Sequence, residues 1–284
     1  MGAPIRTLRA DARRCLSRAG VPNVRQEVDW LLCRALNCSF ASLLARLDCP
    51  SDDAERERFQ TLVRRRGDGE PIQYILGSAP FRGLEFEVGP GVLIPRPETE
   101  LLVDLALSFL PGDGFTLLDW GAGSGCIAAS ILRERPSSRA ILAEKNPQSL
   151  ICAWHNLRRY RLLGRALLLH SRTPGDLPVR AECGLVVSNP PYIPTEALAG
   201  LMREVRDFEP RMALDGGADG MDCYRALFEA SPLWLRPGGL LVLEMGDAHQ
   251  AEALKAQPDK DFELLRSVLD LSAIPRCMAW RYRG

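Results

Sequence analysis

From residue 100 to residue 284, short apolar segments alternate with amphipathic ones, and this alternation constrains the fold more than any other feature. Seven apolar segments are predicted strands: Phe115 to Trp120, Ala140 to Glu144, Ala166 to His170, Leu185 to Ser188, Gly239 to Glu244, Phe262 to Leu269 and Cys277 to Tyr282. Helical stretches separate the first six, which predicts an α/β fold with a mainly parallel, doubly wound sheet covered on both faces. Only Asp270 to Arg276 separates the last two. That connection is too short for a parallel crossover, so we expect an antiparallel edge pair.

The first 78 residues predict helices alone. Pro4 to Ala19 reads as a helix that stops at Gly20, with Pro22 behind it. Side chains that suit helix N-caps follow at intervals: Asn23, Ser39 and Ser51. We therefore expect a small all-helical domain over residues 1–78.

The pattern changes after Gly77. Phe86 and Val88 alternate with acidic residues, and the Gly89-Pro90-Gly91 turn leads into the apolar residues 92–94. This pattern predicts a β-hairpin with its turn at residues 89–91. We assign residues 79–99 to a hairpin linker and residues 100–284 to the sheet domain.

Charge and composition narrow the class of protein. The chain has 36 basic and 36 acidic residues. A zero net charge argues against a protein that binds a nucleic-acid backbone. The basic run Arg64 to Arg66 is expected to be a solvated helix end, with an acidic partner as the alternative. No uninterrupted apolar stretch is long enough for a membrane span, and arginines interrupt the N-terminal segment where a signal peptide would be apolar. We expect a cytoplasmic protein.

Cysteine and histidine give no metal or redox motif. Nine Cys are scattered without a Cys-x-x-Cys pair, which fits small buried side chains in a reducing compartment. The three His lie far apart in the sequence (His155, His170 and His249). We predict no metal site and no His-centred catalytic triad.

A glycine-rich loop follows the first predicted strand. It reads Gly121-Ala122-Gly123-Ser124-Gly125 and leads into a helix at Cys126. Glycines let a backbone turn tightly and approach a ligand at the carboxyl end of a parallel strand. A dinucleotide fingerprint would require its third glycine at residue 126, where this chain has Cys126. The loop suits a ligand without a pyrophosphate, such as an adenosine that carries a methionine; a tight turn without a ligand is the alternative.

Glu144 ends the second predicted strand, 19 residues after Gly125. A carboxylate at this position can accept hydrogen bonds from both ribose hydroxyls of a bound nucleoside. A surface acid at a strand end is the alternative, and the glycine loop that precedes it favours the cofactor role.

The fourth predicted strand ends in Asn189-Pro190-Pro191-Tyr192, the most specific motif in the chain. Two prolines fix the backbone and remove two donors, which leaves a stiff rim rich in carbonyl groups. The Asn189 side-chain oxygen and the Pro190 carbonyl can accept both hydrogens of a planar NH₂ group, while the Tyr192 ring stacks on its face. The motif therefore predicts catalysis on a planar carboxamide or amine nitrogen, with a rigid turn as the alternative.

With these motifs the chain resembles the HemK/PrmC family, the release factor glutamine methyltransferases. The resemblance spans most of the chain and adds three stretches to the glycine loop and Asn189 to Tyr192: residues 69–77, residues 93–100 and residues 213–217. It implies a Rossmann-like class I S-adenosylmethionine methyltransferase fold. It implies transfer of a methyl group to the side-chain nitrogen (N5) of the glutamine in the Gly-Gly-Gln motif of release factors, by a monomer with no metal.

The resemblance also implies roles for individual residues. The cofactor would contact Gly121 to Gly125, Glu144, Thr173 and Asn189, and Asn189 to Tyr192 would hold the substrate, with Asn189, Pro190 and Tyr192 catalytic. The chain departs from the family after the third strand, where Arg172 and Thr173 stand in place of an Asp and an apolar residue. A guanidinium cannot accept a hydrogen bond from an adenine amino group.

Two other functions remain open from the sequence. Asn-Pro-Pro-Tyr is shared with enzymes that methylate amino groups of nucleic-acid bases, although the zero net charge disfavours a direct nucleic-acid partner. A relative that keeps the fold but has lost cofactor affinity is the second alternative.

Overall fold

The computed structural model describes residues 3–110, 112–178, 180, 182–256 and 260–284. The chain divides into two compact units, and it passes between them three times. The first unit consists of residues 1–78 together with 202–208, and the second of residues 79–201 and 209–284. Each unit has its own core.

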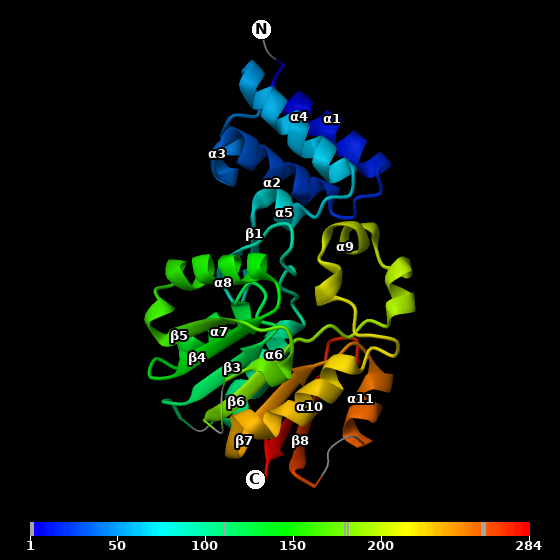
Figure 1. Ribbon diagram of the computed structural model, residues 1–284. Helices are drawn as coiled ribbons and strands as arrows, with labels where there is room; N and C mark the ends of the chain where they lie inside the picture. Colours follow the sequence, from blue (N-terminus) through cyan, green and yellow to red (C-terminus); the bar gives the residue numbers. More distant parts are fainter. Residues whose placement is uncertain (1–2, 111, 179, 181, 257–259) are drawn as a thin grey trace. The chain divides into compact units, whose positions relative to one another are not determined.

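The first unit is helical. Its elements are α1 (Ile5–Arg18), α2 (Val24–Leu36), α3 (Phe40–Ala45), α4 (Asp53–Gly67), α5 (Ile72–Leu76) and α9 (Arg203–Phe208). The helices α1, α2 and α4 lie side by side in Figure 1 and bury Ile5, Leu31 and Phe59 between them. The short helix α9 comes from far along the chain, within the segment that the sequence analysis assigned to the sheet domain.

Two helix-cap predictions for this unit need correction. Asn23 precedes α2, but its side chain makes no cap hydrogen bond. Ser51 is not an N-cap, because its hydroxyl donates to the Ala3 carbonyl. Asp52 caps α4 instead, in a capping box in which Asp52 and Glu55 each accept the backbone N–H of the other. The prediction for Ser39 is confirmed, since its hydroxyl accepts the Ser42 N–H at the start of α3.

The prediction of a solvated helix end is wrong for Arg66. Arg66 is 4% exposed, and it donates to Glu27 of α2 from α4. It also forms an ion pair of 3.0 Å with Glu204 of α9. The alternative of an acidic partner is correct at this residue, and the partner lies within the chain. Arg64 is exposed, as expected.

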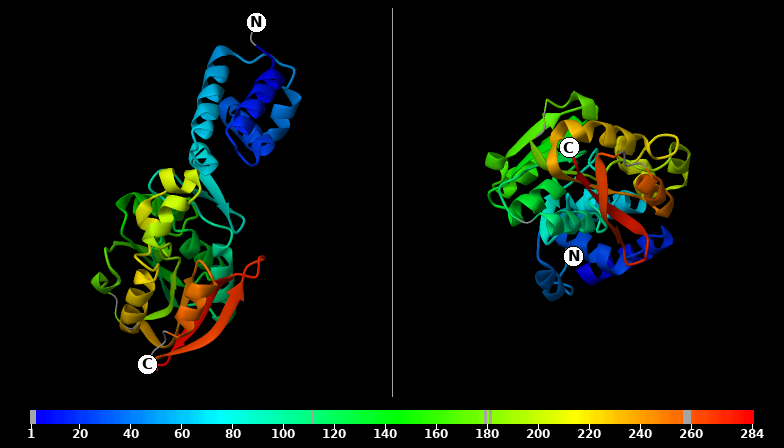
Figure 2. Two further views of the ribbon diagram at one scale, coloured as in Figure 1. Left: turned by 90° about the vertical axis from the view of Figure 1, so that its right-hand side faces the viewer. Right: turned by 90° about the horizontal axis from the view of Figure 1, so that it is seen from below.

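The second unit is a seven-stranded sheet in the order β5-β4-β3-β6-β7-β9-β8. The strands are β3 (Thr116–Trp120), β4 (Arg139–Glu144), β5 (Ala166–His170), β6 (Cys183–Ser188), β7 (Leu235–Glu244), β8 (Phe262–Leu269) and β9 (Pro275–Tyr282). The first five are parallel, and β9 pairs antiparallel with both β7 and β8. This edge pair is orange to red in Figure 2. The predicted fold and the reversed edge are confirmed.

Helices cover both faces of the sheet. On one face α6 (Thr99–Phe109), α7 (Cys126–Glu134) and α8 (Pro147–Arg159) pack on side chains such as Leu117 and Leu185. On the other face α10 (Asp222–Trp234) and α11 (Ala248–Ala256) pack on Leu118 and Leu241. Strand residues adjacent in sequence thus enter different cores, as expected for a sheet buried on both sides.

The hairpin prediction was wrong in its pairing. The hairpin is β1 (Ser78–Phe81) with β2 (Leu84–Glu87), and residues 92–94 form no strand. Its turn lies at Arg82 and Gly83, which both have positive φ. Glycine adopts such a conformation freely, so Gly83 permits the tight turn. Phe81 and Phe86 anchor the hairpin in the core of the second unit.

No helix in the described ranges is long and apolar enough to cross a membrane.

Candidate active site

Four strand ends meet at one edge of the sheet. The strand order reverses between β3 and β6, which are neighbours, while β4 flanks β3 and β7 flanks β6. In open parallel sheets, ligands bind beside the carboxyl ends of the strands at such a switch point. The structure therefore brings the glycine loop, Glu144 and Asn189 to one place, because each directly follows or ends one of these strands.

The glycine loop has a backbone that other residues rarely adopt. Gly121, Gly123 and Gly125 have φ of +75°, +56° and +76°. A Cβ at Gly125 would lie 3.2 Å from the Cβ of Ala153, so this glycine lets α7 pack on α8. A Cβ at Gly121 would meet nothing within 4 Å. The side of the loop at Gly121 is open, as a cradle for a ligand requires.

Glu144 holds the glycine loop from the neighbouring strand. Its carboxylate accepts the backbone N–H of Gly123 at 2.8 Å and that of Asn146 at 2.8 Å. A carboxylate has about four acceptor positions, so two such bonds leave capacity for ribose hydroxyls. Glu144 and the loop thus form one hydrogen-bonded group.

Asp119 lies beneath this group in β3. It is fully buried, and one oxygen accepts the Ala128 N–H in the first turn of α7. Its other oxygen, Oδ1, has no hydrogen-bond partner within the described residues. Burial raises the pKa of Asp119 to about 7; the hydrogen bond from the Ala128 N–H opposes this shift, and the charge of Glu144 adds to it. The sequence analysis gave Asp119 no role.

Asn189 is half-buried directly after β6, and hydrogen bonds from Asn189 and from Ser188 before it join this strand end to two other elements. Its Nδ2 donates to the Thr99 hydroxyl at 3.1 Å, and Thr99 begins α6. The preceding residue, Ser188, donates to the Trp120 carbonyl at 2.7 Å and so joins the end of β6 to that of β3. The stretch of residues 93–100 is anchored by Glu209, which accepts the Ile94 N–H at 3.1 Å.

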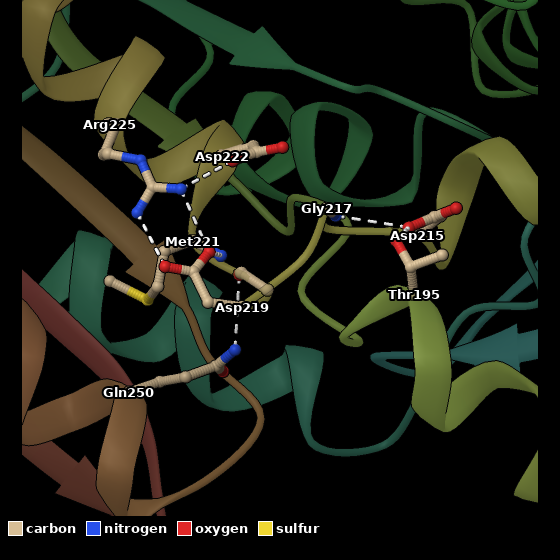
Figure 3. A network of polar contacts seen from close by, with 9 residues as sticks. Thr195, Asp215, Gly217, Asp219, Met221, Asp222, Arg225 and Gln250 are labelled. Carbon is tan, nitrogen blue, oxygen red and sulfur yellow. Dashed lines mark hydrogen bonds and ion pairs between the residues drawn. The ribbon is translucent and has the colours of Figure 1, made fainter.

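Tyr192 is held by Gln250, which also bonds to the loop at residues 213–220. Figure 3 shows polar contacts of this loop, in which Asp215 bonds to Thr195 and Asp219 to Arg225. Gln250, which is buried, donates to the Tyr192 carbonyl at 2.7 Å and to the Gly220 carbonyl at 3.3 Å. A Cβ at Gly216 would lie 2.8 Å from the Pro191 carbonyl oxygen, and one at Gly220 would lie 2.3 Å from that of Tyr192. These glycines let the loop lie directly against the Pro191 and Tyr192 backbone, which explains why residues 216 and 220 are glycines. Burial raises the pKa of the Tyr192 hydroxyl to about 12.

A second buried acid, Glu244, ends β7 beside β6. It is 1% exposed, and its Oε2 has no hydrogen-bond partner in the described parts of the chain. Burial raises its pKa to about 7, although a hydrogen bond with Thr99 opposes the shift. Sequence reasoning missed Glu244. The signal was present, because Glu244 ends its strand as Glu144 does.

Arg172 and Thr173 follow β5, next to β4. Both side chains are exposed. Thr173 caps the short 3₁₀ turn at residues 174–176 and exchanges hydrogen bonds with Asp176. Thr173 therefore lies at the same edge of the sheet as Glu144, but its contacts are with its own loop.

These residues fit S-adenosylmethionine. The open side at Gly121 leaves room for the ligand, Glu144 offers acceptors for the ribose, and the unpartnered oxygen of Asp119 is an acceptor beneath the loop. The described residues contain no cluster of three or more His, Cys, Asp or Glu side chains that could hold a metal ion.

Comparison with known proteins shows what this chain is similar to. Residues 7–77 match the family model of the PrmC N-terminal domain, and residues 99–203 match the methyltransferase small domain. A release factor glutamine methyltransferase of Geobacter sulfurreducens is 42% identical over 81% of this chain and 80% of its own length. One of Moorella thermoacetica is 42% identical over 88% of each chain. A methyltransferase structure from Pyrococcus furiosus shares the fold, with a TM-score of 0.52 at 18% identity, over 72% of this chain and 91% of its own.

Proposed function

Because this chain belongs to the family of release factor glutamine methyltransferases, we propose that it methylates the side-chain nitrogen (N5) of the glutamine in a Gly-Gly-Gln motif of a release factor. The donor in this proposal is S-adenosylmethionine, held by Gly121 to Gly125 and Glu144. The observation that carries the proposal is the position of Asn189 to Tyr192 at the strand end next to the glycine loop.

Asn189 and Pro190 hold the acceptor nitrogen. The side-chain oxygen of Asn189 and the carbonyl of Pro190 accept its two N–H bonds, and the ring of Tyr192 covers the amide plane. With both hydrogens held, the nitrogen lone pair points at the donor and conjugates less with the carbonyl. Positioning of this kind supplies roughly 7–11 kcal/mol of the barrier reduction in well-oriented reactions.

When bound, S-adenosylmethionine would supply an electrophilic methyl group on a sulfonium, with S-adenosylhomocysteine as the leaving group. The substituted nitrogen then loses one proton to solvent. No strong general base is needed for this loss, because an alkylated amide nitrogen is strongly acidic. The residues of the site therefore act by orientation and by exclusion of water.

The helical unit, residues 1–78, has a different role in this proposal. It lacks a glycine loop and a strand-end acid, and its match to the PrmC N-terminal domain supports a separate recognition function. We propose that it docks the body of the release factor. All proposed site residues come from one chain, so a monomer suffices, and a translation factor as substrate implies the cytoplasm.

The test is transfer of a labelled methyl group to a purified release factor, followed by mass spectrometry of the Gly-Gly-Gln peptide. The label should appear on glutamine N5, and Asn189→Ala should abolish turnover while cofactor affinity is largely kept. Label on nucleic acid but not on the release factor would favour the alternative of a base amino-group methyltransferase. Binding without any transfer would favour the inactive relative.

A further inference from the structure

The turn between the last two strands, residues 269–275, is rich in apolar residues, and we call it the apolar tip. Five of its seven residues are apolar, and Asp270 is its only charged residue. Leu269 is 52% exposed, and Leu271 is fully exposed. Turns are usually built from Gly, Pro, Asn, Asp and Ser, so two exposed leucines at such a place are not explained by the turn itself.

Asp270 orders the apolar tip from within. Its Oδ1 accepts the backbone N–H of Ser272 at 2.8 Å and that of Ile274 at 3.0 Å. Its Oδ2 accepts Arg276 Nε at 2.7 Å. The one charge of the tip is therefore used inside the turn, and its side chain is only 12% exposed. The surface that the tip presents to solvent is apolar.

The apolar tip lies at the same edge of the sheet as the candidate active site. Glu244, the last residue of β7, pairs with Cys277 on the antiparallel strand β9. The residues before Cys277 therefore continue past the carboxyl end of β7, and the left view of Figure 2 shows the orange-to-red hairpin projecting there. β7 and β9 lie between β6 and β8. Adjacent strands are about 4.8 Å apart, so the tip lies roughly 10–15 Å along this edge from the end of β6.

A chain of hydrogen bonds joins the apolar tip to Tyr192. Arg276, which binds Asp270, also donates from Nη1 to the Gly246 carbonyl at 2.5 Å. The Gly246 N–H donates to Gln250 Oε1 at 2.9 Å, and Gln250 Nε2 donates to the Tyr192 carbonyl at 2.7 Å. The exposed leucines are thus held in a fixed position relative to the residues that hold the substrate in the proposed function.

We propose that Leu269 and Leu271 dock on an apolar surface of the release factor next to its Gly-Gly-Gln motif. This inference rests on the proposed function, because it requires a protein substrate whose glutamine reaches Asn189 to Tyr192. A standard protein–protein interface covers about 800 Å² on each partner, which is a patch roughly 30 Å across. An interface centred on the glutamine therefore reaches the apolar tip. A rigid apolar projection at that distance adds contact area without ordering a loop on binding.

Steady-state kinetics with two substrates test this docking role. Leu269→Ser with Leu271→Ser should raise KM for the full-length release factor by about tenfold, because apolar contact area is lost. KM for a Gly-Gly-Gln peptide should stay within about twofold, because the peptide needs only Asn189 to Tyr192. The kcat values should stay within about twofold for both substrates, since loss of a uniform binding contact raises KM alone.

Leu264→Ser is the matched control. Leu264 is also an exposed leucine of β8, but it pairs with Trp280, away from the apolar tip. It should leave KM for both substrates unchanged. An unchanged KM for the release factor in the double variant would overturn the inference. An equal rise for protein and peptide would also overturn it, because the tip would then act on the catalytic site and not on docking.

Crosslinking makes the test independent of the reaction. p-Benzoylphenylalanine in place of Leu271 should crosslink on irradiation to the release factor close to its Gly-Gly-Gln motif, and the same group in place of Leu264 should not. Crosslinks only between copies of this chain would assign the tip to self-association and overturn the inference. Crosslinking at position 271 together with no methyl transfer by the wild type would refute the proposed function alone. Methyl transfer by the wild type with no crosslink at position 271 would refute the inference alone.

Discussion

Glu27 of the helical unit and the acids Asp119 and Glu244 of the sheet unit are buried in opposite ways. In the helical unit, Glu27 is 4% exposed and meets the guanidinium of Arg66, which itself is 4% exposed. Burial lowers the pKa of Arg66, but the hydrogen bond with Glu27 and the charge of Glu204 more than offset this, so its pKa is raised. In the sheet unit, Asp119 and Glu244 are equally buried, yet each has an oxygen without a hydrogen-bond partner among the described residues.

This difference separates two uses of a buried charge. A paired charge holds two elements together, and it has no reason to change its protonation state. An unpaired buried carboxyl destabilises the fold at neutral pH, because burial penalises its ionised form. Both unpaired acids end or lie in strands at the predicted active site, and strongly shifted pKa values gather at such sites. We therefore interpret Glu27 as structural, and Asp119 and Glu244 as parts of the site.

The largest effect is expected where a paired charge loses its partner. Arg66→Met should lower the free energy of unfolding of the helical unit by about 3–5 kcal/mol, because it leaves Glu27 buried without a cation. The measurement is hydrogen exchange of amides in α2 and α4. Arg64→Met is the matched control on the same helix, where the exposed arginine bonds only to Thr61 among the interactions seen, and less than about 0.5 kcal/mol is expected. A loss below about 1 kcal/mol for Arg66→Met would show that the pair is not structural.

Removal of an unpaired buried acid should instead raise the free energy of unfolding. The folded-state pKa of Glu244 is about 7, above the 4.5 of a free glutamate, so its contribution to stability is present below pH 4.5 and is lost as pH rises through 7. Glu244→Gln does not titrate. At pH 8 the variant should be more stable than the wild type by about 2–3 kcal/mol, because linkage alone amounts to roughly 3 kcal/mol.

Denaturant unfolding of both proteins at several pH values checks this expectation. Asp119 titrates in both proteins, so its effect cancels when the free energy of unfolding of the wild type is subtracted from that of the variant. The gain should vanish below pH 4.5, and the exposed control Glu263→Gln should show none. A variant less stable than the wild type at pH 8 would mean that Glu244 is held as a favourable charge.

Local pattern predicted most of the sheet unit. Strand ends such as Trp120 and Ser188 were predicted to the residue, because a central strand buried on both faces is a continuous apolar run with sharp limits. The convergence of Glu144 and Asn189 was predictable for the same reason, since carboxyl ends of parallel strands share one edge.

The errors arose where distant residues decide the structure. Arg66 is buried with two acidic partners that are distant in the sequence, Glu27 on α2 and Glu204 on α9. The N-cap of α4 is Asp52 and not its neighbour Ser51, because the Ser51 hydroxyl donates to the Ala3 carbonyl instead. Glu244 was missed because only the strand order places β7 beside β6.

A smaller effect, on cofactor affinity, is expected at Glu144, the acid that contacts the glycine loop. Glu144→Ala should weaken S-adenosylmethionine binding by roughly tenfold, or about 1.4 kcal/mol, because the ribose loses a charged acceptor. Calorimetry of the isolated protein measures this, with the exposed acid Glu229→Ala on α10 as control. An unchanged affinity would remove Glu144 from the cofactor site and leave it only the Gly123 and Asn146 N–H bonds.

The smallest effect, on KM for the protein substrate, is expected from substitution of exposed apolar residues of the helical unit. Its buried charges are paired, so a partner must be recognised by what its surface exposes. Phe40 and Leu44 are 52% and 45% exposed, and their spacing of four residues on α3 places them on one face of the helix. Such a pair offers apolar surface to a protein substrate but nothing to a short peptide, which needs only the Asn189 to Tyr192 site. Phe40→Ser with Leu44→Ser should therefore raise KM for the full-length release factor by about fivefold, or about 1 kcal/mol, and leave KM for a Gly-Gly-Gln peptide unaffected.

Ile151→Ser is the matched control, because Ile151 is equally apolar and 59% exposed but lies on α8 of the sheet unit. An equal loss on protein and peptide would mean that the helical unit supports the catalytic site, and no loss on either would mean that docking uses another surface of the unit.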